Sequence, residues 1–222
     1  MLISLQKYKW FLIPYFIFFC VGLIILSFWN KETVHLWSCQ HHSPALDVFF
    51  SWSTNIGDGL FVILIAIILL FYRMSDGLFI LSTYSISAVI AQIIKHLVNA
   101  PRPLAFFHDE LKLHVVHGVK LLMANSFPSG HSTSAFALFL TLSIIIRYNG
   151  LQIFFFICAL LVAYSRVYLS QHFLMDILVG SAIGVGTTLI YLTYHLRIKE
   201  TWLSKPIYTL WNKHNKTNTK QL

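Results

Sequence analysis

Charged residues are scarce in this chain. Of its 222 residues, 11% are Asp, Glu, Lys or Arg, whereas roughly a quarter are charged in an ordinary soluble domain. The hydrophobic share is 57%, and the mean hydropathy is +0.69. One soluble core of this size cannot bury so many apolar side chains. The composition therefore excludes a typical water-soluble globule and favours a lipid environment.

Cysteine is also rare, and acidic residues are half as frequent as basic ones. Cys20, Cys39 and Cys158 match neither a disulfide framework nor metal-ligand spacing, so we expect no disulfide within the chain. Eight Asp and Glu oppose sixteen Lys and Arg, which gives a formal charge of +8. Such an excess suits nucleic acid, anionic lipid or an anionic substrate, and the positions of the charges decide among them.

Six nearly charge-free runs are candidates to cross a bilayer, which takes about 20 apolar residues in a helix. They are residues 10–30, 59–72, 77–94, 132–146, 149–165 and 177–196. The first run ends in Phe28-Trp29 without a small-residue cleavage site, and we interpret it as a retained anchor rather than a signal peptide. The second and fourth runs are short, and each can be extended at one end.

Basic residues are unevenly divided between the two sides of such a six-span protein. Ten lie on the side of the termini and six on the opposite side. The positive-inside rule therefore predicts cytoplasmic termini in a cytoplasmic (inner) membrane. We expect residues 1–200 to form one six-span domain, and 201–222 to form a polar, basic cytoplasmic tail near anionic lipid. No segment is typical of nucleic-acid recognition, so we expect no nucleic-acid partner.

Two segments on the outer side are too polar to span a membrane and too apolar to leave it. Residues 43–52 begin with Ser-Pro, which favours a helix start, and residues 106–123 mix leucines and valines with histidines and charges. We expect both to form interfacial helices or lids. The predicted fold is an all-α integral membrane protein: six transmembrane helices in a bundle with extracytoplasmic interfacial helices.

Polar residues that should be rare near a membrane gather at three span ends on the outer side. At the end of the third run, Lys95 and Arg102 are seven residues apart. Pro101 and Pro103 stop the helix there, so we expect Arg102 to leave it at a turn. Taken alone, this pair is better explained as two interfacial cations that reach lipid headgroups.

The second segment, Pro128-Ser129-Gly130-His131, predicts the opening of the fourth helix. Free backbone N–H groups at a helix start bind anions, and Gly130 allows an anion to approach the main chain closely. His131 in the first turn is placed to give a proton to a leaving oxygen. A capped helix with a histidine in a wet interface explains the segment equally well.

The third segment lies between the fifth and sixth runs and contains Arg166, His172 and Asp176. Four residues separate His172 from Asp176, so on a helix they share a face. The carboxylate then fixes one ring tautomer and leaves the other nitrogen free to act as a nucleophile. Arg166 reaches the same place only if the chain turns between the spans. The alternative is an ion pair between Arg166 and Asp176 beside an incidental histidine.

Together the three segments supply three cations, a backbone anion site and two histidines on one membrane face. This set suits transfer of a phosphoryl group through a phosphohistidine: cations neutralise the phosphate oxygens, one histidine attacks phosphorus, and the other protonates the departing oxygen. The chemistry requires no metal or other cofactor. The remaining histidines match no known set of metal ligands, so we expect no metal site.

These segments resemble the signature of the type 2 phosphatidic acid phosphatases, a superfamily that also includes vanadium-dependent haloperoxidases. The signature is Lys, six residues, Arg-Pro; then Pro-Ser-Gly-His; then Ser-Arg, five residues, His, three residues, Asp. Residues 95–103, 128–131 and 165–176 fit it in order. Members often carry Gly two residues before the last histidine, where this chain has Ser170.

The resemblance implies a role for each motif residue. His172 would be the nucleophile, Asp176 would orient it, and His131 would be the general acid. The phosphate would be held by the remaining matched residues, Lys95, Arg102, Ser129, Gly130 and Arg166. The departure at Ser170 concerns the geometry of the turn and not these roles.

The same resemblance implies a membrane enzyme that hydrolyses a lipid phosphate monoester or diphosphate through a phosphohistidine. Undecaprenyl diphosphate, phosphatidylglycerophosphate, phosphatidic acid and lipid A phosphate are family substrates, and the motifs do not separate them. A lipid phosphotransferase would use the same intermediate. The haloperoxidase relatives are soluble, which the six spans argue against. A transporter or scaffold is disfavoured because inverted repeats and midplane charges are lacking.

Overall fold

The computed structural model describes residues 5–107, 113–120 and 122–198, and within these ranges the chain is helical without strands. Its long helices are α1 (Lys9–Phe28), α4 (Gly59–Tyr72), α5 (Met74–Val98), α7 (Gly130–Ile146), α8 (Asn149–Tyr168) and α9 (Leu174–Ile198). Shorter segments are the 3-10 turns η1 (Leu5–Tyr8) and η2 (Thr54–Gly57) and the helices α2 (Lys31–Gln40), α3 (Pro44–Ser53) and α6 (Pro103–Phe107). Each of the six predicted apolar runs is therefore helical.

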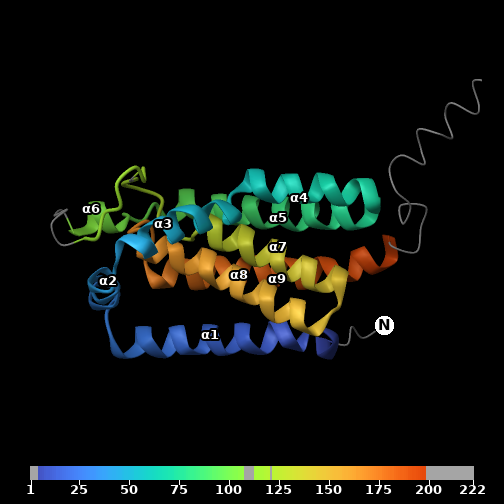
Figure 1. Ribbon diagram of the computed structural model, residues 1–222, viewed down its shortest axis with the longest axis horizontal. Helices are drawn as coiled ribbons and strands as arrows, with labels where there is room; N and C mark the ends of the chain where they lie inside the picture. Colours follow the sequence, from blue (N-terminus) through green and yellow to red (C-terminus); the bar gives the residue numbers. More distant parts are fainter. Residues whose placement is uncertain (1–4, 108–112, 121, 199–222) are drawn as a thin grey trace, which may run out of the picture.

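The long helices lie side by side, and α7 runs through the middle of the bundle (Figure 1). It packs against α5, α8 and α9, and nearly all its side chains from Ser132 to Ile144 are buried. The hydroxyls of Ser134, Thr141 and Ser143 donate to carbonyls one turn back in α7 itself. These bonds satisfy polar groups that would otherwise be buried without a partner.

Small residues let α9 approach α7 closely. A Cβ atom at Gly180 would lie 2.5 Å from the Ser129 carbonyl oxygen, and one at Gly184 would lie 2.5 Å from the Thr133 carbonyl oxygen. Both distances are too short for real carbon–oxygen contacts, so only glycine fits. Gly180 and Gly184 thus form a packing surface of α9, whereas a Cβ at Gly186 would meet nothing within 4 Å.

The number of membrane spans is not confirmed as six. Four helical stretches are long and apolar enough to cross a membrane: Leu5–Phe28, Met74–Phe107, Asn149–Tyr168 and Leu174–Leu196. Helix α4 reaches the required length only together with the preceding segment Pro44–Gly57, from which it is bent by 54°. Helix α7 has 17 residues, which is short of the roughly 20 that cross a bilayer. The described residues therefore support four spans, or five if the bent pair is one broken span, and six stays a prediction.

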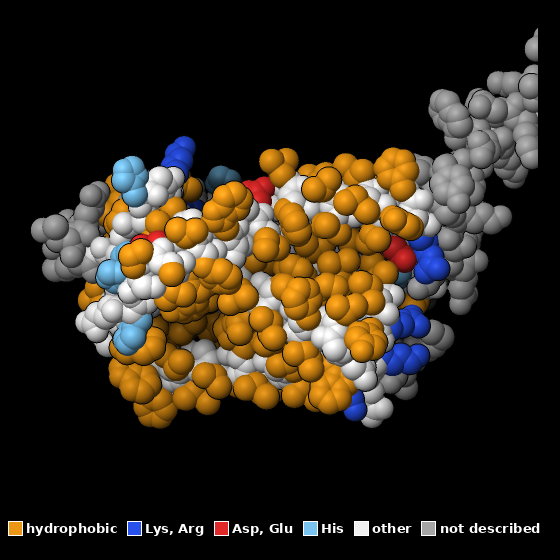
Figure 2. Space-filling view, in the orientation of Figure 1, with side chains coloured by type: hydrophobic (Ala, Val, Ile, Leu, Met, Phe, Trp, Pro, Cys, Tyr) orange, Lys and Arg blue, Asp and Glu red, His pale blue; other side chains and the backbone are white. Residues whose placement is uncertain are grey.

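The surface of the bundle is apolar along its length. Figure 2 shows hydrophobic side chains over most of the visible face, with Lys and Arg gathered at the end near the N-terminus, and histidines together with further Lys or Arg at the other end. Phe16, Leu60 and Ile190 are 65%, 78% and 72% exposed, respectively. In a bilayer these side chains contact acyl chains, and the backbone groups beneath them are paired within the helices.

The two expected interfacial segments have different structures. Residues 43–52 match α3, whose start is capped by Ser43: its Oγ accepts from the Leu46 N–H at 3.3 Å. A helix over residues 106–123 is wrong for the part that the structure describes, because α6 ends at Phe107 and residues 113–120 form an irregular loop. Within that loop Gly118 has a φ of +82°, which is incompatible with a continuous helix.

Helix α2 was not predicted, although Asn30 caps it by accepting from the Thr33 N–H at 2.8 Å. The predicted tail at residues 201–222 and the charged stretch at 108–112 lie outside the described residues. Helix α1, the expected anchor, packs into the bundle through Phe11, whose ring lies edge-on to Phe136 and Phe156.

Replacing Gly184 with Ala should loosen the bundle, because the new methyl group would collide with the Thr133 carbonyl in α7. We expect a loss of about 1–3 kcal/mol, as is typical of overpacking. Thermal unfolding of detergent-purified protein measures it. Gly186→Ala is the matched control two residues away, and it should be neutral or slightly stabilising. Equal melting temperatures for the two variants would contradict the assigned α7–α9 contact.

Candidate active site

The three motif segments meet at the end of the bundle where α2, α3 and α6 lie (Figure 1). A cavity of about 280 Å³ opens there, between α4, α5, α7 and the turn that joins α8 to α9. Six of the eight predicted site residues line it: Lys95, Arg102, Gly130, His131, Arg166 and His172. The other two, Ser129 and Asp176, lie directly behind this wall. Residues up to 81 positions apart in the chain, Lys95 and Asp176, are thus brought to one place.

Lys95 and Arg102 reach the cavity in the way that the two prolines suggest. Helix α5 ends at Val98, and its C-cap Asn99 adopts a left-handed conformation whose N–H donates to the Lys95 carbonyl. The chain then turns, and the Arg102 guanidinium donates to the Ala124 carbonyl at 3.0 Å and to Gln171 Oε1 at 3.0 Å. These neutral acceptors fix the guanidinium without cancelling its charge.

Helix α7 opens at the cavity. Ser129 is its N-cap, and the Ser129 Oγ accepts from the Ser132 N–H at 3.3 Å. Gly130 follows, and a Cβ there would lie 3.7 Å from Lys95 Nζ, so the ammonium group sits against the helix start. His131 comes next and lines the cavity. A helix N-terminus beside an ammonium group is a favourable position for an anion.

The turn between α8 and α9 places Arg166 and His172 on the same wall. The carbonyl of Arg166 accepts from the N–H groups of Gln171 and His172, at 2.9 Å and 3.0 Å, which closes the turn. Ser170 within it has a φ of +52°. Left-handed backbone costs a non-glycine residue about 1–2 kcal/mol, which explains why glycine suits this position. Here the Ser170 Oγ donates to the His114 carbonyl at 3.0 Å.

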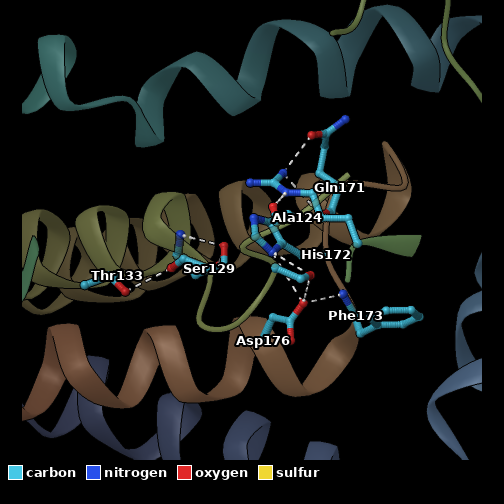
Figure 3. A network of polar contacts seen from close by, with 10 residues as sticks. Ala124, Ser129, Thr133, Gln171, His172, Phe173 and Asp176 are labelled. Carbon is cyan, nitrogen blue, oxygen red and sulfur yellow. Dashed lines mark hydrogen bonds and ion pairs between the residues drawn. The ribbon is translucent and has the colours of Figure 1, made fainter. Parts of the chain in front are cut away.

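His172 and Asp176 contact each other, but not on a shared helical face as the spacing suggested. Helix α9 begins at Leu174, so His172 lies in the turn and Asp176 in the first helical turn. The Asp176 Oδ2 atom accepts from the Phe173 N–H at 2.9 Å, as a helix-start carboxylate does, and lies 3.4 Å from His172 Nδ1. Figure 3 shows His172 between Gln171 and Asp176.

Asp176 is held by two further residues, Ser126 and Ser129. Ser126 donates its hydroxyl to the same Oδ2 at 2.5 Å and lies 3.4 Å from His172 Nδ1. The main-chain carbonyl of Asp176 accepts from the Ser129 N–H at 2.9 Å, which joins the starts of α7 and α9. Asp176 is engaged in these contacts, and Arg166 donates to Thr54. The structure therefore does not support the alternative of a simple Arg166–Asp176 ion pair.

The His172 imidazole is neutral at physiological pH. Burial lowers its pKa to about 4, with Arg166 and Arg102 acting in the same direction and Asp176 opposing them. A neutral ring that donates from Nδ1 to the Asp176 carboxylate carries a lone pair on Nε2. The residue is 1% exposed, so the ring is largely shielded from bulk water. This is the state that a nucleophilic histidine requires.

Positive charge dominates the cavity. Lys95, Arg102 and Arg166 line it, and the described lining residues include neither Asp nor Glu. Arg166 donates from Nη1 to the Thr54 hydroxyl at 2.6 Å, while its Nε is buried without a hydrogen-bond partner among the described residues. A phosphate in the cavity would supply the acceptors that this guanidinium lacks.

Several residues that complete the site were missed by the sequence. Gln171 and Ser126 stand beside the motifs, next to His172 and two residues before Pro128, and adjacency to a motif was the signal available for them. Thr54 carries no local signal, because its partner is 112 residues away. His35 in α2 was also missed; it packs its buried ring against Phe173, and burial lowers its pKa to about 4.

Comparison with known proteins gives a consistent result. A sequence model of the PAP2 superfamily matches residues 76–200. A lipid A 1-phosphatase of Rhizobium etli is 27% identical over 151 residues, which cover 59% of this chain and 63% of that protein. A phosphatidylglycerophosphatase B of Bacillus subtilis is 28% identical over 156 residues, covering 64% and 71%. The chain thus spans less than two thirds of the length of the first of these relatives.

Solved structures share the fold. The crystal structure of Aquifex aeolicus LpxE has a TM-score of 0.66 at 27% identity, and the match covers 73% of this chain and 94% of that one. A PAP2-type phosphatidylglycerolphosphate phosphatase from Bacillus subtilis has a TM-score of 0.63 at 21% identity, covering 85% and 97%. The second likeness concerns the fold alone.

Removing the Thr54 hydroxyl should weaken anion binding in the cavity. Thr54→Val keeps the side-chain shape but leaves the buried Arg166 Nη1 without its partner, so the guanidinium loses its fixed position. We expect the Kd for orthovanadate to rise about tenfold, equivalent to about 1.4 kcal/mol, as measured by calorimetry in detergent. Thr54→Ser should restore binding, and Asn55→Ala on the same turn is the control. Wild-type affinity in Thr54→Val would show that Thr54 does not position Arg166.

Proposed function

The chain belongs to the PAP2 superfamily, and on that premise we propose that it is a membrane-bound lipid phosphatase. The observation that carries the proposal is the cavity itself: three cations and two histidines surround it at one end of a bundle of membrane-crossing helices. An anionic group that arrives from the membrane meets complementary charge there. The reaction is hydrolysis of a lipid phosphate monoester or diphosphate.

The first step is attack on phosphorus. Lys95, Arg102 and Arg166 would neutralise the phosphate oxygens, with the N-terminus of α7 at Gly130 adding backbone donors. His172 Nε2 would form a bond to phosphorus while the bond from phosphorus to the lipid oxygen breaks. Burial and the surrounding cations lower the pKa of His131 in the absence of a ligand, and the negative charge of a bound phosphate would oppose those cations. His131 would therefore be protonated in the complex and would give its proton to that departing oxygen. The products of this step are a phosphohistidine, the dephosphorylated lipid and a neutral His131.

The second step returns the enzyme to its starting state. A water molecule would give a proton to the now neutral His131 while its oxygen attacks phosphorus, and the bond from phosphorus to Nε2 would break. Inorganic phosphate leaves, and His131 is protonated again. Asp176 would stabilise the positive charge on the His172 ring in both steps through the contact at Nδ1.

The membrane position of the site is part of the proposal. The cavity is lined by the start of α7 and by the turn between α8 and α9, which lie at the opposite end of the bundle from the N-terminus (Figure 1). The excess of basic residues on the side of the termini favours cytoplasmic termini. We therefore place the site at the extracytoplasmic face of the cytoplasmic membrane. The named activities of the relatives, lipid A 1-phosphatase and phosphatidylglycerophosphatase, support a lipid phosphate as the substrate.

Detergent-purified protein should release inorganic phosphate from at least one lipid phosphate. The panel is lipid A, phosphatidylglycerophosphate, phosphatidic acid and undecaprenyl diphosphate. We expect release to survive EDTA, because cations of the chain neutralise the phosphate, and to be blocked by vanadate, which mimics five-coordinate phosphorus. Activity that is lost with EDTA and restored by added metal would contradict the mechanism. Transfer of the phosphoryl group to an added lipid alcohol, without phosphate release, would identify a phosphotransferase instead.

Replacement of each histidine by Ala should affect turnover in a different way. His172→Ala should abolish turnover and any trapped phosphoenzyme for every substrate. His131→Ala should lose about 10²-fold or more on a lipid phosphate, as is typical of a general acid, but far less on an aryl phosphate whose phenol leaves without a proton. Asp176→Asn should fall between the two, because it keeps the shape but weakens support of the charged ring.

Rapid quenching of the reaction with labelled substrate measures the phosphoenzyme, and steady-state kinetics give the two rate losses. Gln40→Ala, an exposed change on α2, controls for expression and handling. Equal losses of His131→Ala on both substrates, or phosphoenzyme in His172→Ala, would show that the roles are assigned wrongly.

A further inference from the structure

One side of the cavity is formed by α5, and it leads to the outside of the bundle. Tyr84, Ala88, Ala91, Gln92 and Lys95 line the cavity, at the three- and four-residue intervals of one helical face. A second hollow, here named the α5 groove, lies on the neighbouring face of the same helix and is lined by Ala88, Val89, Gln92, Ile93, His96 and Leu97. Ala88 and Gln92 line both, so the two hollows adjoin each other along α5.

The α5 groove faces the surroundings of the bundle. Val89, Ile93 and Leu97 are 58%, 55% and 80% exposed, and all three lie in a stretch long and apolar enough to span a membrane. In a bilayer such side chains contact hydrocarbon. Because the groove joins the phosphate-sized cavity at the small side chain of Ala88, a lipid whose phosphate occupies the cavity has a direct path for its chain along α5.

Gln92 is the polar residue that the cavity and the α5 groove share. It is exposed, and its amide makes no hydrogen bond to another described residue. An amide that faces hydrocarbon without a partner is costly. It precedes Lys95 by three residues, which places it about 4.5 Å along the helix axis from the lysine, towards the middle of α5. A ligand phosphate near Lys95 therefore has the Gln92 amide beside the atoms that follow the phosphate.

We propose that Gln92 selects the substrate: its amide hydrogen-bonds the ester, amide or hydroxyl groups that join the phosphate to the hydrocarbon chains, and the α5 groove takes the first part of one chain. This inference rests on the proposed function and favours, as its substrate, lipid phosphates built on glycerol or sugar over polyprenyl monophosphates. A polyprenyl phosphate has hydrocarbon directly after the phosphate oxygen, so it would leave the amide unpaired. A site built around a hydrogen bond rejects a substrate that lacks it.

The test compares two classes of substrate in one variant. Gln92→Leu keeps the approximate size but removes the amide. We expect kcat/KM to fall about tenfold for phosphatidic acid and phosphatidylglycerophosphate, and to stay the same or rise for a polyprenyl phosphate, so that selectivity shifts by one order of magnitude. The rate with a water-soluble aryl phosphate should not change. Gln40→Leu, the same substitution at an exposed glutamine of α2, is the matched control.

A second variant tests the groove. Val89→Trp fills it without touching the residues that hold the phosphate, so KM should rise several-fold for long-chain lipid phosphates and not for the aryl phosphate. If Val89→Trp instead changes the oligomeric state and leaves KM unaltered, this face of α5 binds a second copy of the chain, and the groove assignment is overturned.

The outcomes separate this inference from the function on which it rests. Wild-type protein that releases phosphate from no lipid overturns the proposed function, and the inference falls with it. Wild-type protein that hydrolyses polyprenyl phosphates but no glycerol- or sugar-based lipid leaves the phosphatase standing and overturns the role of Gln92. The role of Gln92 is also overturned if Gln92→Leu lowers kcat/KM equally for both lipid classes, or lowers it for neither.

Discussion

The contact between the starts of α7 and α9 is the constraint on which the site depends. The Ser129 N–H donates to the Asp176 carbonyl at 2.9 Å, and Gly180 and Gly184 let the two helices continue in close contact below that bond. His131 is two residues after Ser129, while His172 and Asp176 flank the start of α9. A shift of either helix would therefore change the distance between the two histidines, which is why the glycines at this interface matter for chemistry as well as stability.

The cations of the cavity are held mainly by uncharged oxygens. Arg102 donates to Gln171 and to the Ala124 carbonyl, and Arg166 donates to the Thr54 hydroxyl. Carboxylate partners would stabilise the guanidinium groups in the absence of a ligand, but they would also cancel the charge that a phosphate needs. Neutral acceptors orient the donors and leave that charge available. The like charges then repel one another until an anion binds, so the site gains most from an anionic ligand.

An outer layer supports the turn that carries His172. His114 in the loop at residues 113–120 lies 2.7 Å from Asp47 Oδ1 in α3, and its carbonyl accepts from Ser170. The Lys120 carbonyl accepts from the Gln171 side chain, which in turn holds Arg102. The strained backbone at Ser170 is therefore fixed by residues outside the membrane-crossing helices. Relatives often carry glycine at this position. In this chain the Ser170 side chain instead contributes a hydrogen bond to the outer layer, which glycine cannot do.

Sequence alone determined the positions of the long helices and the identity of the motif residues, because hydropathy and residue spacing are local properties of the chain. It also placed Lys95, His131 and His172 at one end of the bundle, since helices that alternate in direction bring alternate ends together. Tertiary structure decided the rest. Only the folded chain shows that His172 lies before α9 and not on it, that residues 113–120 form a loop, and that α4 is bent by 54° from the segment before it. Thr54 joins Arg166 across 112 residues, and Gln92 meets the cavity because of how α5 is rotated in the bundle. Such contacts depend on how distant segments fit together, and no periodicity in the sequence records that fit.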